Sequence, residues 1–176
     1  MQYFDITNSP NVFDKELAKR LGFKKIFNAG SEIEIVENLE RQTKRPFLIF
    51  SGNPNIISTL IKYEGAIGIL TNGETINQQI LDKVRENKKL IVFNSYYLTI
   101  SQKERVSKIY KLRKLFKEAY KAKVNSTIIS LAPNPDYLLS FMQLFEIAKL
   151  IASDEHHAKK MLTNLGEILN DIQKKA

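Results

Sequence analysis

Short apolar runs alternate with longer amphipathic segments along this chain. The apolar runs predict strands at Gln2–Thr7, Phe23–Asn28, Pro46–Ser51, Ala66–Leu70, Leu90–Asn94 and Ser126–Leu131. Helical periodicity predicts helices over residues 12–21, 31–44, 54–63, 74–87, 101–123, 134–151, 154–163 and 164–174. The runs are apolar on both faces, as strands buried in a parallel sheet are, so the alternation indicates an α/β fold.

Nothing in this pattern divides the chain into separate units. The 176 residues contain no linker, low-complexity tract or clear repeat, and we expect a single domain over residues 1–176. Residues typical of turns lie between the predicted strands and the helices that follow them. Ser51-Gly52-Asn53-Pro54 follows a strand, and Thr71 and Glu74 have the spacing of a helix capping box. Periodicity leaves two architectures open, a doubly wound open sheet and a small closed barrel.

The composition limits the kinds of chemistry that the chain can perform and the kinds of partner that it can bind. The chain has no cysteine, which excludes disulfides, thiolate metal sites and a cysteine nucleophile. Its start, MQYFDITNSP, lacks the basic and apolar regions of a signal peptide, and no apolar run reaches the roughly 18 residues that span a membrane. We therefore expect a cytoplasmic protein. A pI near 9.5 favours an anionic partner, either a nucleic acid or a membrane surface.

Almost all of the excess positive charge belongs to one segment. Residues 101–124 hold nine of the 27 Lys and Arg residues but only two of the 19 acidic residues. On a helix, one side of this segment is apolar, with Ile109, Leu112, Leu115, Phe116, Ala119 and Tyr120. A sector of roughly 60° on the opposite side carries Lys103, Lys114, Lys117 and Lys121, flanked by Lys111 and Arg113. Neighbouring like charges repel, so a helix shaped by stability alone would include more acids.

This arrangement suits a polyanion, because each Lys or Arg that neutralises a phosphate releases a counterion and adds affinity. The predicted RNA contacts are Lys103, Arg105, Lys108, Lys111, Arg113, Lys114, Lys117 and Lys121. Tyr96 and Tyr97 stand in the preceding loop, where they could stack on unpaired bases. The alternative is a solvated lysine-rich face beside two half-buried tyrosines, and for the tyrosines we favour this structural explanation.

Residues suited to catalysis or metal binding are scarce. The only histidines, His156 and His157, are adjacent, so on a helix they point about 100° apart and cannot share a metal in the usual i, i+4 manner. Gly52 and Gly73 follow strands without a phosphate-loop motif, and ordinary turns explain them. Asp5 is a lone carboxylate, for which capping or ion pairing is the better explanation. We predict no catalytic residue, no metal site and no cofactor on this chain.

The segment 136–153 is apolar over most of a helical circumference. Its polar positions form one narrow stripe, with Ser140, Gln143, Glu146 and Lys149. Such a helix must be covered on more than one side. The cover is either the domain with its following helices, or a partner protein anchored by Phe141 and Phe145, which have i, i+4 spacing.

Several motifs of the C-terminal half follow one another in a recognisable order over about residues 65–165. They are the strand Leu90–Asn94, the Tyr-Tyr loop, a basic helix with Arg105 and Arg113, the strand Asn125–Pro133, an apolar helix over Pro135–Ile151 and a closing segment Ala152–Leu162. This order resembles the archaeal and eukaryotic ribonuclease P protein component 3 family, which is related by fold to the PHP-type barrel hydrolases. The resemblance implies a small TIM-barrel-like (β/α) fold with about six or seven parallel strands and extra C-terminal helices.

The resemblance also implies a non-catalytic role in ribonuclease P, whose RNA, with bound Mg²⁺, removes the 5′ leader of precursor tRNA. The implied partners are the RNase P RNA, component 2 in a heterodimer or a dimer of heterodimers, and the other RNase P proteins, with no membrane partner. PHP hydrolases end their first strand with D-x-H-x-H metal ligands, whereas this chain has Asp5-Ile6-Thr7-Asn8-Ser9. Without imidazoles the chain cannot hold that metal cluster, which agrees with an RNA-associated scaffold.

Two other functions stay open on the sequence. One is a stand-alone α/β-barrel hydrolase that acts on a phosphorylated substrate, although the missing His, Cys and phosphate motifs count against it. The other is a protein-interaction module in which the basic helix is incidental.

Overall fold

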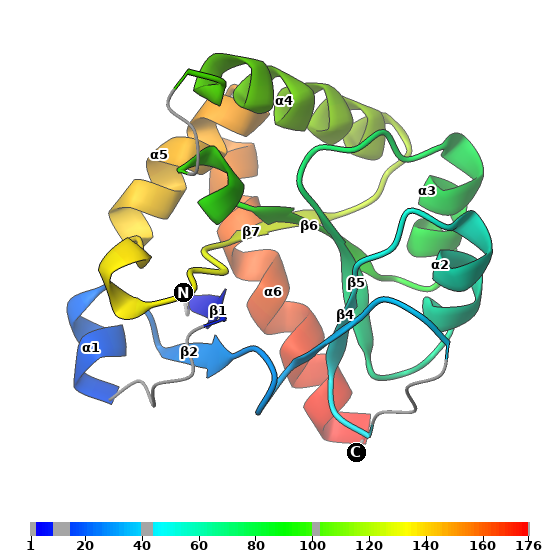
Figure 1. Ribbon diagram of the computed structural model, residues 1–176, viewed down its shortest axis with the longest axis horizontal. Coiled ribbons are helices and arrows are strands. Elements are labelled where there is room, and N and C mark those ends of the chain that lie inside the picture. The colour runs from blue at the N-terminus through cyan, green and yellow to red at the C-terminus, as the bar shows by residue number, and fades with distance from the viewer. Residues whose placement is uncertain (1–2, 9–14, 40–43, 100–102, 176) are drawn as a thin grey trace.

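The computed structural model describes residues 3–8, 15–39, 44–99 and 103–175. Its strands are β1 (Phe4–Thr7), β2 (Lys25–Asn28), β3 (Glu34–Val36), β4 (Phe47–Ile49), β5 (Ala66–Thr71), β6 (Leu90–Asn94) and β7 (Ser126–Ile129). Its α-helices are α1 (Lys15–Arg20), α2 (Pro54–Leu60), α3 (Gln78–Glu86), α4 (Arg105–Lys121), α5 (Phe141–Ala152) and α6 (Glu155–Lys175). Two short 3₁₀ turns, η1 (Tyr96–Leu98) and η2 (Pro135–Tyr137), follow β6 and β7 (Figure 1).

The strands form two parallel sheets, which confirms the expected α/β class. One sheet has the order β1-β2 and the other the order β3-β4-β5-β6-β7. Every paired strand runs parallel to its neighbour, because helices or long loops connect consecutive strands. The two sheets do not join into one closed ladder, so the expected barrel is not shown.

The two sheets nevertheless contact each other through backbone groups along both edges of the two-stranded sheet, beside β2 and beside β1. A single parallel bridge links Ala29, after β2, with Ile33, before β3. On the other side, Leu131 N–H donates to the Ile6 carbonyl oxygen at 2.8 Å, just beyond the end of β7. Asp5 strengthens this second junction, because its Oδ1 accepts the backbone N–H of Ser130 at 2.7 Å. The carboxyl ends of β1 and β7 are thereby fixed side by side.

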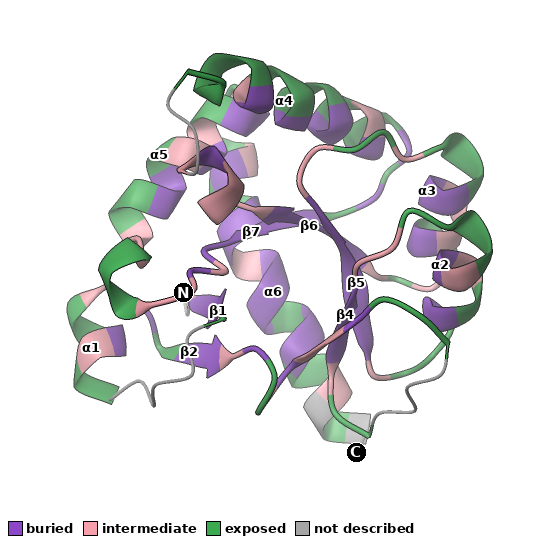
Figure 2. Cartoon of the chain, in the orientation of Figure 1, coloured by how far each residue is buried: buried purple, intermediate pink, exposed green. Residues whose placement is uncertain are grey.

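The apolar side chains form two clusters, one on each face of the large sheet, as the period-two alternation of a strand requires. Ile91 and Phe93 of β6 face the cluster that helices α2 to α5 cover, while Leu90 and Val92 face the other. Helix α6 serves both clusters. Its first half adds Met161 and Leu162 to the first cluster, and its second half adds residues 165, 168 and 169 to the second. Figure 2 shows the resulting buried band through the sheet and along α6.

Some predicted helices differ from those in the structure. The helix expected over residues 31–44 is wrong, because strand β3 lies there and pairs with β4; residues 40–43 lie outside the described part. The sequence Glu32-Ile33-Glu34-Ile35 alternates with period two, which is the pattern of a half-exposed strand. The helices expected over 154–163 and 164–174 are one continuous helix, α6. Gly166 therefore lies inside a helix, where its low propensity is outweighed by burial against the core.

The residues at which helices start also differ from those expected. Thr71 and Glu74 do bond, at 2.8 Å between Oγ1 and Oε2, but they close a turn, and Asn77 caps α3. Ser153 ends α5 with a left-handed backbone, φ 68°. Asp154 caps α6, since its Oδ1 accepts the backbone N–H of His157 at 2.8 Å. That hydrogen bond lowers the pKa of the Asp154 carboxyl.

Candidate nucleic-acid interface

The basic helix α4 forms one outer edge of the molecule (Figure 1). It packs on α5 and on the 3₁₀ turn η1. Its inner side is apolar and fully enclosed, with Leu112, Leu115 and Ala119 at most 2% exposed. The predicted amphipathic helix is therefore confirmed, and its outward side remains open to solvent (Figure 2).

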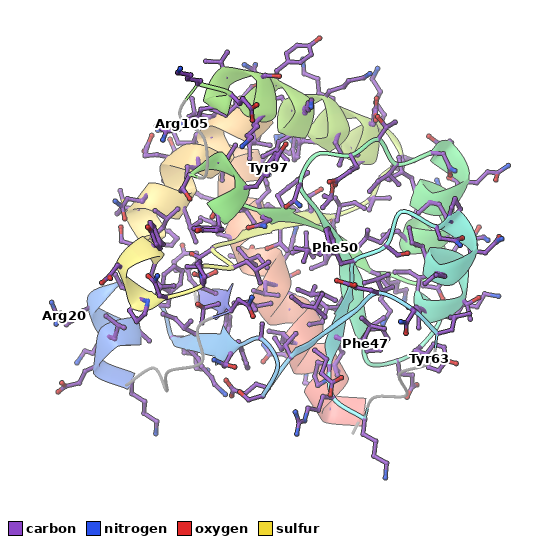
Figure 3. All side chains as sticks on the ribbon, viewed as in Figure 1. Arg20, Phe47, Phe50, Tyr63, Tyr97 and Arg105 are labelled. Carbon is purple, nitrogen blue, oxygen red and sulfur yellow. The ribbon has the colours of Figure 1, made fainter. Side chains whose placement is uncertain are left out.

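Two of the predicted cations, Arg105 and Lys108, bond the start of α4 to η1. The Nε of Arg105 donates to the Leu98 carbonyl oxygen at 3.2 Å, although the residue as a whole is exposed (Figure 3). Lys108 is only 5% exposed, and its Nζ donates to the Tyr97 carbonyl oxygen at 3.2 Å. The same Nζ lies 3.5 Å from a Glu104 carboxylate oxygen. Lys108 therefore lacks the accessible ammonium group that a phosphate contact needs.

The other predicted cations are exposed. They are Lys103, in the turn before α4, and Lys111, Arg113, Lys114, Lys117 and Lys121 on the helix. Arg113 donates to the Ser153 hydroxyl at 2.7 Å, which ties α4 to the junction of α5 and α6. Within the described residues, none of the five lysines forms an ion pair. Some exposed lysines elsewhere do pair, as Lys159 does with Glu155 at 2.6 Å.

We name as the lysine face the side of α4 that carries Lys111, Lys114, Lys117 and Lys121, together with Lys103 in the turn before the helix. Cations without internal partners are hydrated and free to exchange their counterions for phosphates. Like charges at i, i+3 and i, i+4 along one helix also repel, and an RNA backbone would relieve that repulsion. The lysine face therefore has the electrostatic character of a surface for a polyanion.

Three large apolar side chains of α4 are exposed. The prediction was wrong for Tyr120, which was placed on the apolar side and is 58% exposed, and it did not consider the other two. Tyr110 is 69% exposed and Val106 is 80% exposed. At about 100° per residue, Tyr110 falls in the same sector as Lys114, Lys117 and Lys121. An aromatic ring among unpaired cations is typical of proteins that bind unpaired nucleic-acid strands. The helical periodicity of the sequence was enough to place Tyr110 among these lysines.

The two tyrosines of η1 have structural roles, as we favoured. The Tyr96 ring packs edge-on against Tyr137, with 5.5 Å between ring centres. The Tyr97 ring lies 4.3 Å from the Nζ of Lys108, at the distance of a cation–π contact. Both rings are half-buried by these contacts.

Phe141 and Phe145 pack within the chain itself. Phe141 stacks on Tyr3 with 4.0 Å between ring centres, and a β-carbon on Gly22 would come 3.0 Å from the Phe141 β-carbon. Phe145 is 9% exposed and lies 6.0 Å from Phe141 between ring centres. The domain therefore covers these two rings, and the apolar residues of α5 that stay exposed are Met142 and Leu150.

A separate hollow of about 430 Å³ lies at the carboxyl ends of β4 and β5, where ligands often bind in α/β folds. Its polar lining includes Glu37, Ser51, Glu74 and Asn77, and in the described part of the chain no Lys, Arg or His lines it. A phosphorylated substrate would therefore meet carboxylates here without a compensating cation.

Other residues considered for chemistry also have structural partners. Gly73 N–H donates to the Thr71 hydroxyl at 2.9 Å, so the turn itself uses this amide. His157 bonds Asp154 at 2.5 Å and packs edge-on against Tyr120. Burial raises the pKa of Asp5 to about 6, and hydrogen bonds from Ser130 and Ile6 offset part of that rise. Among the described residues, no three His, Asp or Glu side chains gather as metal ligands. No described helix combines the length and apolar character needed to cross a bilayer.

The fold has a counterpart among solved structures. The chain is similar to a chain in a cryo-EM structure of archaeal ribonuclease P with mature tRNA, with a TM-score of 0.70 and 16% sequence identity. The alignment covers 97% of this chain and 81% of that chain. No family model matches the sequence. No curated protein matches it either. At this level of identity, the likeness establishes the shared fold.

Proposed function

We propose that this chain is a protein subunit of ribonuclease P of the component 3 type, and that it supports RNA-catalysed removal of the 5′ leader from precursor tRNA. It binds the RNase P RNA through the lysine face of α4, together with Arg105 and Arg113. Lys108 is left out of this contact set because its ammonium group is enclosed beside Tyr97.

The observation that carries the proposal is the set of five exposed lysines without ion pairs among the described residues, four on α4 and one, Lys103, in the turn before it. The fold shared over nearly the whole chain with a protein of archaeal ribonuclease P supports the same conclusion independently of charge. So does the order of sequence motifs that resembles component 3. We also propose that the fold is related to that of the PHP-type barrels, and that the two sheets are an incompletely closed form of such a barrel.

In this role the chain contributes binding and leaves bond cleavage to the RNA. Lysines that neutralise phosphates allow RNA segments to approach one another, which lowers the Mg²⁺ concentration that the RNA fold requires. The catalytic Mg²⁺ belongs to the RNA, and this chain needs no cofactor. We further propose the cytoplasm as its location, and component 2 and the other RNase P proteins as its protein partners.

The alternative of a hydrolase for phosphorylated substrates fits the described residues less well. The hollow at the carboxyl ends of β4 and β5 presents Glu37 and Glu74 and no described cation. A cluster of lysines without ion pairs lies on α4 instead, spread along the helix in the manner of a surface for an extended polyanion.

Reconstitution tests the proposal. The chain and component 2 are added to RNase P RNA, and cleavage of precursor tRNA is followed across a Mg²⁺ titration. We expect cleavage at a lower Mg²⁺ concentration than with the RNA alone or with component 2 alone. Identical Mg²⁺ dependence with and without the chain would rule out the proposed role, and phosphatase or phosphodiesterase activity of the isolated chain would favour the hydrolase.

A further inference from the structure

A groove of about 440 Å³ separates the lysine face of α4 from the loop that follows β5. On the helix side it is lined by Tyr110, Lys111, Lys114 and Glu118, and on the loop side by Asn72 and Glu74. Tyr97 of η1 also contributes to its lining. Two aromatic rings, two ammonium groups, an amide and two carboxylates thus line one hollow.

The loop side of the groove is fixed against the helix. Gly73 has a φ of 97°, and a β-carbon at this position would lie 3.2 Å from the Lys111 β-carbon and 3.3 Å from Leu112 Cδ2. Glycine therefore suits this position, since a β-carbon would crowd the helix and the left-handed φ disfavours other residues. The loop is also braced internally, because one carboxylate oxygen of Glu74 accepts from the Asn72 N–H and the Thr71 hydroxyl, both at 2.8 Å.

The groove carries charges of both signs. Lys111 and Lys114 supply positive charge from the helix, and neither forms an ion pair within the described residues. Glu74 supplies negative charge from the loop, and Glu118 supplies it from the helix. A simple inorganic anion would be attracted by the ammonium groups and repelled by the carboxylates. A nucleotide can use both kinds of group, since its phosphates are acceptors and anions whereas its base edge carries hydrogen-bond donors.

The loop side also offers an amide that can contact a base edge. The Asn72 side-chain oxygen accepts from the Asn94 amide nitrogen at 3.0 Å. This bond orients the Asn72 amide and leaves its nitrogen as the donor for a ligand. Tyr110, 69% exposed, provides a flat apolar surface at the same groove. Bases within a duplex are already paired and stacked, whereas an unpaired base can turn outward and stack on such a ring.

We propose that this groove binds one unpaired nucleotide of an RNA strand. The base stacks on Tyr110 with its edge toward Asn72 and Glu74, and the flanking phosphates lie at Lys111 and Lys114. The inference rests on the proposed function and adds to it a preference for single-stranded over duplex RNA, which a lysine face alone would not provide.

The test compares the affinity of the full chain for a fluorescein-labelled RNA octamer of mixed sequence with its affinity for the same octamer annealed to its complement. Tyr110→Ala removes the stacking surface, and we expect it to lower the affinity for the single strand about tenfold. Its affinity for the duplex stays the same. Tyr110→Phe keeps the ring and retains the single-strand affinity. Tyr120→Ala is the matched control on the same helix, outside the groove, and changes neither affinity.

The inference is overturned if Tyr110→Ala has no effect, if it weakens both RNAs equally, or if Tyr120→Ala has the same effect. The variant Lys117→Gln/Lys121→Gln, outside the groove lining, separates this result from the fate of the proposed function. Loss of affinity for both RNAs in this variant, with no effect of Tyr110→Ala, rejects the groove and retains the lysine face. No effect in either variant rejects the proposed interface and the groove together.

Discussion

The ammonium group of Lys108 lies 4.3 Å from the centre of the Tyr97 ring and also donates a hydrogen bond to the Tyr97 carbonyl oxygen. One cation of the basic helix thus joins α4 to η1, while the lysines of the lysine face remain in solvent. The cations of this helix therefore have two separate roles: Lys108 stabilises the fold, and the lysine face is available for binding.

Lys108→Met tests this separation, because it keeps the aliphatic stem and removes the charge. We expect the free energy of unfolding to fall by about 1–2 kcal/mol through loss of the cation–π contact and the carbonyl hydrogen bond. Lys111→Met, at an exposed position on the same helix, should change it by less than about 0.5 kcal/mol. Urea unfolding followed by circular dichroism measures both, and equal values for the two variants would contradict the structural role of Lys108.

Gly73→Ala tests the contact between the β5 loop and α4. The left-handed φ of 97° and the close approach to Lys111 both oppose a side chain here, so we expect destabilisation of more than about 1 kcal/mol. Gly30→Ala is the matched control, since Gly30 has a φ of 98° but no atom within 4 Å of an added β-carbon. Destabilisation by Gly73→Ala no larger than by Gly30→Ala would show that the loop does not press on the helix.

Asp5→Asn tests the buried carboxyl between β1 and β7. The pKa of Asp5 is about 6 in the folded chain against an ordinary value of 3.8, so the folded state binds the proton more tightly. The carboxyl's stabilising contribution is complete below about pH 4 and is lost as the pH rises through 6, with a total on the order of 3 kcal/mol. Asn keeps the acceptor oxygen for Ser130 and does not titrate in this range.

We therefore expect the stability difference between Asp5→Asn and the wild type to shift in favour of the variant between pH 4 and pH 7. Urea titrations at four pH values in that interval measure it. A constant difference would mean that Asp5 has an ordinary pKa and that burial does not penalise its charge.

Phe141→Ala tests whether the domain itself covers the start of α5. Because Phe141 stacks on Tyr3 and packs against Gly22, we expect the free energy of unfolding to decrease by about 2 kcal/mol in the chain without partners. Met142→Ala, at a neighbouring residue that is 59% exposed, should have little effect. If only binding to a partner protein suffers in Phe141→Ala, the ring is an interface anchor and the packing argument fails.

Much of the fold could be predicted from the sequence, because buried parallel strands leave a local signal. The run Leu90–Asn94 became a strand with the same bounds. The sequence analysis missed strand β3 because the strand is short and half-exposed. A helical pattern is judged over more than ten residues, and over that length the alternation of Ile33 and Ile35 with glutamates is lost. Whether the two sheets close depends on pairing between distant segments, which no local pattern specifies.

The lysine face could also be predicted, since helical periodicity places Lys114, Lys117 and Lys121 together. The inward position of Lys108 had a signal that the interpretation did not use: Lys108 precedes Leu112 by four residues, on the apolar side of the helix. The groove could not be predicted, because it forms where the loop at Gly73 meets α4, and that contact joins residues far apart in the sequence.

The central claim is that the lysine face of α4 neutralises RNA phosphates. It is tested most directly by the salt dependence of affinity for RNase P RNA, because the slope of log affinity against log salt counts the phosphates neutralised. The test variant removes three charges from the lysine face: Lys114→Gln, Lys117→Gln and Lys121→Gln. The control removes three exposed lysines elsewhere: Lys19→Gln, Lys62→Gln and Lys160→Gln.

Both variants lose the same net charge, so they differ only in where the charge is removed. We predict that the slope of the test variant is shallower than that of the wild type by about two to three, at roughly 0.7–0.9 per lost contact, and that the control keeps the wild-type slope. Equal slopes for the two variants would contradict the account, since the RNA would then respond to overall charge and not to the lysine face.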